Sequence, residues 1–214
     1  MTNLDDVEQI EEILARIHAG KKLRKEELTT VASILQEIEL QEVGRKLGAD
    51  DTYLLLSALL REPSWKDERL FERFFDIQDP TTASLVMKKL CSTREGRRNY
   101  LERLLNLALG SVWDEDGDLQ QDALEFLGEF AIEAKRSDAP DSRRKEVLRF
   151  LFDQFDDEDS TKELKHWSYV AILRAGETPN EELPSRYAIY DFKPENENIN
   201  WSLVAEIRKE LGLW

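Results

Sequence analysis

The sequence predicts an all-α protein, and three observations support this fold class. Apolar residues recur at helical spacing from the start of the chain, as at Leu4, Val7 and Ile10. Strand signals are nearly absent, because the chain has no Asn-Gly hairpin and no sustained alternation of apolar and polar residues. Asp and Gly recur between the apolar segments, where they are suited to begin and end helices.

Residues 1–47 are predicted to form two amphipathic helices. One apolar stripe runs from Leu4 to Ile17, and a second runs from Leu28 to Ile38. Gly20 lies between the two stripes and the segment "GRKLGADD" follows the second, so both helices have a suitable end.

Residues 48–176 alternate between two kinds of apolar segment. One kind opens with Asp, and the other carries two pairs of neighbouring apolar residues, such as Leu70 and Phe71 followed by Phe74 and Phe75. A helix pair of this kind can bury its apolar stripe only by stacking on the next pair, so the pattern predicts a short α-solenoid. The Asp-led segments begin at Asp51, Asp79, Asp118 and Asp159.

Two of these segments carry a family resemblance. In "DLQQDALEFLGEF", Asp118 opens the second helix of a pair, Ala123 and Leu127 face inward, and Gly128 allows close packing. The segment "DPTTASLVMKKL" has an Asp-Pro opening. Over about residues 48 to 176 the chain therefore resembles the HEAT-repeat family of helical-hairpin solenoids, and the resemblance implies a right-handed stack of irregular hairpins.

Residues 177–214 are predicted to form a loop and a final helix. The loop is rich in Pro, Asn and Glu and has one short helix around Tyr187. The final helix should cap the exposed end of the solenoid, which completes a single all-α domain spanning 1–214. Its apolar stripe consists of Trp201, Val204, Ile207 and Leu211.

The charge of the chain restricts the class of partner. With 45 acids against 30 bases the net charge is −15, which disfavours nucleic acid and anionic membranes and favours basic proteins. One cysteine excludes an internal disulfide, the N-terminus lacks the features of a signal peptide, and no apolar run approaches the ~20 residues of a membrane helix. We therefore expect a cytoplasmic protein without a cofactor. The sequence does not indicate whether the protein forms oligomers.

The stretch "DEDGDLQQDALE", which begins at Asp114, resembles a calcium-binding loop because acids occupy its first, third, fifth and twelfth positions. An EF-hand loop requires glycine at the sixth position, where this chain has Leu119. Asp118 is expected instead to be a helix N-cap, with Gln121 reaching back to it. The stretch is therefore interpreted as a turn, without a metal site.

A second acidic turn, "FDDEDSTKE", is predicted to carry a capping box formed by Ser160 and Glu163. In stacked hairpins such turns lie along one edge, ~10 Å apart. Capping explains only one or two acids in each turn, so the edge is predicted to contact a basic partner. The predicted partner-binding residues are Trp113, Asp114, Glu115, Asp116, Asp118, Asp156, Asp157, Glu158, Asp159 and Trp167.

The turns on the opposite edge, "STREGRR" and "AKRSDAPDSRRK", carry more bases than acids. Arg97, Arg98, Arg143 and Arg144 lie at predicted helix starts, where cations are disfavoured. They are interpreted as solvated surface charge, with a minor phosphate or carboxylate site as the alternative.

The sequence contains no recognisable set of catalytic residues. His18 and His166 are the only histidines, and neither falls in a constellation with a serine or with Cys91. Structural roles are expected for both histidines, and Cys91 is expected to be a small buried residue. The prediction is therefore that the protein is not an enzyme.

The function predicted from these features is non-enzymatic protein binding. Its most concrete form is an inhibitor, such as an immunity protein that neutralises a basic toxin, for example a nuclease, because a cationic active site is covered best by an acidic surface. One alternative is an adaptor or scaffold that binds a peptide or helix in a concave groove. The other is a helical-repeat enzyme of the DNA-glycosylase or bilin-lyase type, since a fold does not fix a function.

Overall fold

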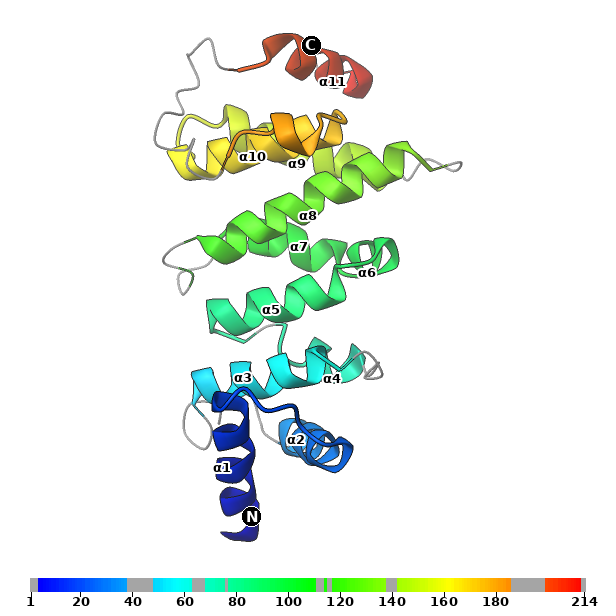
Figure 1. Ribbon diagram of the computed structural model, residues 1–214. Helices are drawn as coiled ribbons and strands as arrows, with labels where there is room; N and C mark the ends of the chain where they lie inside the picture. The colour runs from blue at the N-terminus through cyan, green and yellow to red at the C-terminus, as the bar shows by residue number, and fades with distance from the viewer. Residues whose placement is uncertain are drawn as a thin grey trace. The chain divides into compact units, whose positions relative to one another are not determined.

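The all-α prediction is confirmed by a computed structural model, in which the described residues form α-helices and one short 3-10 helix and contain no strand (Figure 1). The chain divides into two compact units, Met1–Leu90 (unit 1) and Cys91–Trp214 (unit 2). The single domain spanning 1–214 stays a prediction. The described residues are 4–37, 48–62, 68–75, 77–110, 114, 117–137, 142–185 and 199–212.

Unit 1 contains five described helices around a core of leucine and phenylalanine. α3 packs against α1, α2 and α5, and α4 packs against α2 and α5. Leu35, Leu55 and Phe74 are fully buried between them. The two predicted N-terminal helices are confirmed. The helices are α1 (Leu4–His18), α2 (Lys25–Glu37), α3 (Ala49–Leu60), α4 (Glu68–Glu72) and α5 (Pro80–Leu90).

The Asp-led helix starts are only partly correct. Asp79 does cap α5, because its Oδ2 accepts a hydrogen bond of 2.8 Å from the backbone N–H of Thr82. α3 begins at Ala49, so Asp51 lies within its first turn and does not open the helix. An acid in the first turn still complements the helix dipole, which explains why the pattern located the helices.

Unit 2 is built around α8, which packs against α6, α7, α9 and α10 (Figure 1). α11 lies against α9 and α10 and buries Val204, Ile207 and Leu211 as predicted, whereas Trp201 is exposed. The short helix predicted around Tyr187 lies outside the described residues. The helices are α6 (Arg94–Asn99), α7 (Leu101–Ala108), α8 (Asp118–Lys135), α9 (Arg143–Asp156), α10 (Lys162–Ala175), η2 (Asn180–Glu182) and α11 (Trp201–Leu211).

A close backbone approach joins α8 to α10 at Gly128. A Cβ placed on Gly128 would lie 2.9 Å from the carbonyl oxygen and 3.1 Å from the Cα of Ala171. Only glycine therefore fits here, as the sequence predicted. Just beyond the ends of both helices, Nε of Arg136 lies 2.7 Å from Oε1 of Glu177. α8 and α10 therefore run in the same direction, and their N-termini lie at the same end of unit 2.

Gly128→Ala should destabilise unit 2 by up to about 2 kcal/mol, because the added methyl group meets backbone that cannot rotate away, at a cost of about 1 to 3 kcal/mol. This cost exceeds the gain of about 1 kcal/mol that alanine brings to a helix. Urea unfolding followed by tryptophan fluorescence measures the change.

Gly48→Ala is the control and should cost less than about 1 kcal/mol, since the Cβ there would meet only the side chain of Asp51 and the cost is that of alanine at the N-cap of α3. A Gly128→Ala protein that is at least as stable as the wild type would contradict this account of the helix contact.

Candidate functional site

The two acidic turns precede α8 and α10, so their described residues lie at one end of unit 2. We call Glu158, Asp159 and Glu163 the acidic end. All three side chains are exposed, and within the described part of the chain their carboxylates make no ion pair. Of the predicted partner-binding residues, Trp113, Glu115 and Asp116 lie outside the described residues.

Asp114 is a buried capping residue. Its carboxylate accepts hydrogen bonds from the backbone N–H groups of Leu119 and Gln120, at 3.4 and 2.9 Å. Gly117 has a left-handed φ of 69°, and the bend at this residue places the Asp114 carboxylate next to the first turn of α8. The prediction that Asp118 is the N-cap is therefore wrong, because Asp118 is the first residue of the helix and is exposed.

The turn before α10 is also capped differently from the prediction. Thr161, and not Ser160, is the N-cap, and its Oγ1 accepts a hydrogen bond of 3.1 Å from the N–H of Leu164. The carboxylate of Asp157 accepts hydrogen bonds from the N–H of Asp159 and the hydroxyl of Ser160, each at 3.1 Å. Asp157 therefore holds the shape of the turn and leaves Glu158 and Asp159 facing the solvent.

Asp156, at the end of α9, forms an ion pair with Arg208 of α11. The guanidinium of Arg208 also lies 5.0 Å from the centre of the Phe152 ring, a distance typical of a cation–π contact. Asp156 therefore joins two helices and is less available to a partner than Glu158 or Asp159.

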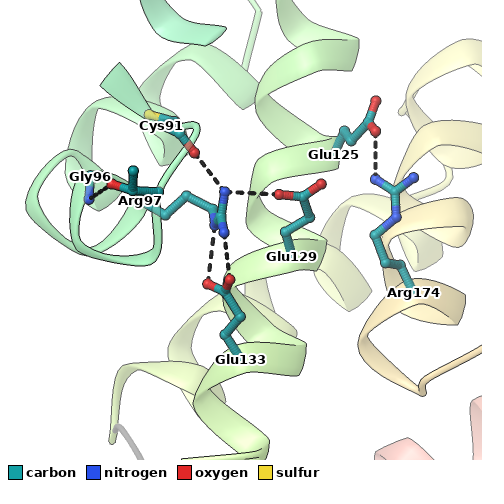
Figure 2. Close-up of polar contacts among 8 residues, drawn as sticks. Cys91, Gly96, Arg97, Glu125, Glu129, Glu133 and Arg174 are labelled. Carbon is teal, nitrogen blue, oxygen red and sulfur yellow. Dashed lines mark hydrogen bonds and ion pairs between the residues drawn. The ribbon is translucent and has the colours of Figure 1, made fainter. Parts of the chain in front are cut away.

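Arg97 is the centre of a polar cluster that ties α6 to α8 (Figure 2). Its side chain is buried, and its Nη1 donates to the carbonyl oxygen of Cys91 at 2.6 Å and lies 2.9 Å from Oε2 of Glu129. Its Nε donates to Oε2 of Glu133 at 3.1 Å. The interpretation of Arg97 as solvated surface charge is therefore wrong.

The pKa values in this cluster reflect burial and charge together. Burial alone would lower the pKa of Arg97, but the hydrogen bonds and charges of Glu133 and Glu129 raise it above its usual value. Burial raises the pKa of Glu129 despite the attraction of Arg97 and Arg174. The cluster is a structural ion network, because a buried guanidinium needs several carboxylates to offset its desolvation.

Arg143 and Arg144 of the second basic turn are also bound to acids of this chain. Nε of Arg143 lies 3.2 Å from Oε2 of Glu146, and Arg143 pairs with Glu102 as well. Nη1 of Arg144 lies 3.0 Å from Oε2 of Glu210. A phosphate at this edge would have to displace these carboxylates, which argues against the alternative of an anion site.

A pocket of about 340 Å³ lies between α8, α10 and the segment that follows α10. Trp167 forms part of its wall, so this predicted partner-binding residue faces a cavity beside the acidic end. Oε1 of Glu125 lies 2.9 Å from Nη1 of Arg174 across the pocket (Figure 2). Its lining includes Gln121, Glu125, Trp167, Val170, Arg174 and Leu183.

His166 and Cys91 are buried, in agreement with their predicted structural roles. His166 packs edge-on against Trp167 with ring centres 4.6 Å apart, and burial lowers its pKa to about 4. Burial raises the pKa of the Cys91 thiol to about 12, so it is not a nucleophile at neutral pH. Among the described residues, no group of three or more His, Cys, Asp or Glu side chains is arranged to hold a metal ion.

Unit 1 has a pocket of different character, with a volume of about 370 Å³. Apolar residues such as Leu23 and Leu28 form part of its lining, and Lys21, Lys22 and Arg61 also line it. This cationic rim does not suit a basic partner. Within the described ranges, no helix has the length and apolar character needed to cross a membrane.

No protein-family model, no curated protein and no solved structure matches the chain. The resemblance to HEAT repeats stays a prediction, and the function has to be inferred from the surface of the molecule itself.

Asp114→Ala should lower the free energy of unfolding by about 0.5 to 2 kcal/mol, because two backbone N–H groups of α8 lose their acceptor. Asp114→Asn keeps one side-chain oxygen and should recover part of the loss. The measurement is urea unfolding of both variants.

Asp159→Ala is the control for the Asp114 variant, and it should change stability by less than about 0.5 kcal/mol because its side chain is exposed. Equal effects of the Asp114 and Asp159 substitutions would show that Asp114 is not the cap.

The burial of His166 should make stability depend on pH. Its pKa is about 4 in the folded protein and about 6.5 in the unfolded chain, so the unfolded chain takes up the proton first as the pH falls. The full stability is present above about pH 6.5, and up to about 3 kcal/mol is lost as the pH falls towards 4.

The free energy of unfolding, measured between pH 7 and pH 5, should fall in the wild type and stay nearly flat in His166→Gln. Glu27, whose pKa is lowered to about 2 chiefly by its hydrogen bonds with Arg24, titrates below this window in the folded protein. Parallel pH profiles for the two proteins would contradict the role given to His166.

Proposed function

We propose that this protein is a non-enzymatic binding module whose acidic end recognises a basic protein partner. The observation that carries the proposal is the contrast within unit 2. Glu158, Asp159 and Glu163 face the solvent without an ion pair among the described residues, whereas arginines such as Arg97 and Arg144 bind acids of the chain itself.

Because of this division of charge, the acidic end favours cationic partners over anionic ones. Exposed carboxylates on a chain of net charge −15 attract cationic surfaces at long range and speed their encounter. Capping of α10 is supplied by Thr161, and Asp157 bonds within the turn, so hydrogen bonding within the turn does not account for Glu158 and Asp159, whereas Glu163 also complements the dipole of α10.

The most concrete form of the proposal is an inhibitor, such as an immunity protein that covers the cationic active site of a toxin, for example a nuclease. An inhibitor needs a rigid surface, and the succession of packed helices in unit 2 supports one. We propose on the same basis that the helices belong to a short HEAT-like solenoid acting in the cytoplasm.

A second candidate function is a scaffold that binds a peptide or helix in a groove. The observation in its favour is the pocket beside Trp167. Binding of this kind depends mainly on apolar contact and would change little with salt, whereas recognition by the acidic end should weaken as salt screens the charges. The paired arginines Arg97, Arg143 and Arg144 argue against a helical-repeat enzyme of the DNA-glycosylase type, because they are not available to phosphates. We propose binding in preference to an enzyme of the bilin-lyase type as well.

The test is affinity capture from a native lysate of the source cells with the immobilised full chain at low salt, followed by a salt step and mass spectrometry. The triple variant Glu158→Gln, Asp159→Asn, Glu163→Gln should lose a basic protein that the wild type retains and releases with salt. The purified partner should then be assayed for its own activity, which the wild type should inhibit.

The matched control is Glu11→Gln, Glu12→Gln, Glu37→Gln, because these exposed acids lie in unit 1 and their loss changes the net charge equally, from −15 to −12 (−15 + 3). The control should retain the partner. If both triple variants lose it, the attraction comes from net charge alone; if neither loses it, the acidic end is not the binding surface.

A further inference from the structure

The pocket between α8 and α10 lies one helical turn from Glu163 of the acidic end. Glu163, Trp167, Val170 and Arg174 follow one another on α10 at spacings of four, three and four residues, so they lie on one face of the helix. The last three of them line the pocket, and the exposed Glu163 stands one turn before Trp167. A partner held at the acidic end therefore lies directly beside the pocket.

The charges around the pocket favour a cation. Glu125 uses Oε1 in its pair with Arg174 and its side chain remains 46% exposed, so the carboxylate can accept a further hydrogen bond. Glu129 lies close enough to Glu125 for the charge of Glu125 to raise its pKa, although burial is the larger cause. A guest cation would relieve this repulsion, whereas a guest anion would add to it.

Arg174 opposes a guest cation, but it already pairs with Glu125, as Arg97 does with Glu129. The carboxylates of Glu163 and of Glu181 and Glu182 in η2 are exposed in this part of unit 2, against the two bases Lys162 and Lys165 of α10. The local balance is therefore negative.

The wall of the pocket adds a preference among cations. Trp167 is the aromatic side chain best suited to hold a cation against its face. A planar guanidinium stacks on such a ring and donates two parallel hydrogen bonds to a carboxylate, whereas an ammonium is a compact and strongly hydrated point charge. A volume of about 340 Å³ is near the lower end for ligand pockets, which suits a single long side chain.

We propose that this pocket is the anchor site for one arginine side chain of the basic partner, with its guanidinium against the indole of Trp167 and hydrogen-bonded to Glu125. The inference rests on the proposed function for the identity of the partner. The site itself is defined by the chemistry of its own lining and can be tested without the partner.

The probe is Nα-acetylargininamide, titrated into the full-length ¹⁵N-labelled protein while the tryptophan indole N–H signals are followed by NMR. The Trp167 signal, identified from its loss in Trp167→Leu, should shift and saturate. The neutral isostere Nα-acetylcitrullinamide and the anion Nα-acetylglycine should leave it unchanged, and Nα-acetyllysinamide should bind more weakly than the arginine compound.

Two variants test the pocket in different ways. Glu125→Gln removes the charged acceptor, and Val170→Phe fills the pocket while Glu125 and Arg174 stay in place. Each should raise the dissociation constant of the arginine compound at least about tenfold. Circular dichroism confirms that both are folded, and the Glu158, Asp159, Glu163 triple variant should change the constant much less.

Absence of a saturable shift in the wild type would overturn the inference, and so would equal binding of the arginine and citrulline compounds or preferential binding of the anion. The proposed function is contradicted by a different result from the one that contradicts the anchor site. If the arginine compound does not bind but the triple variant still loses the basic protein, the anchor site is wrong and the acidic end stands. If the compound binds but no basic protein is retained, the anchor site stands without the proposed partner.

Discussion

The contact of α8 with α10 at Gly128 is the constraint on which unit 2 depends. The absence of a side chain lets the two backbones approach until a Cβ on Gly128 would be 2.9 Å from the carbonyl oxygen of Ala171. Because the helices run in the same direction, this contact places both acidic turns at one end of the unit. It also sets the spacing of the Glu125 and Trp167 side chains, so the candidate surface and the pocket both follow from one close approach.

The distribution of charge follows from the cost of burying a cation. Arg97 lies in the interior, and leaving a buried guanidinium without partners would cost several kcal/mol, on the order of 3 to 5. Glu129 and Glu133 meet this requirement from successive turns of α8. Arg144 and Arg174 are also paired with acids of the unit. Because the chain has 45 acids against 30 bases, other acids have no arginine to pair with, and part of them faces the solvent at the acidic end.

Helical periodicity was sufficient to predict the fold class and three of the four residues of the α11 stripe, because these depend on local spacing, whereas Trp201 is exposed. The close packing at Gly128 was expected from the resemblance of its segment to HEAT repeats. The cap of α5 at Asp79 was correct, but those of α8 and α10 were wrong by four residues and by one. Asp114 reaches α8 only through the left-handed turn at Gly117. The burial of Arg97 depends on Glu133, which is 36 residues away in the sequence. The spacing of Glu125, Glu129 and Glu133 at intervals of four was the one available signal for an ion network on α8. The pocket depends on the segment after α10, whose placement no local pattern fixes.

The acidic end and the pocket would contribute to different steps of binding. Exposed carboxylates such as Glu158 act over a distance set by the Debye length, about 8 Å at physiological salt, so they chiefly raise the association rate. A side chain enclosed between Trp167 and Glu125 is shielded from water and chiefly slows dissociation. The exposed carboxylates raise the association rate of any basic protein. Only a protein with an arginine at the right place on its surface also dissociates more slowly. Charge alone would therefore make the module promiscuous, and selectivity among basic partners has to come from the pocket.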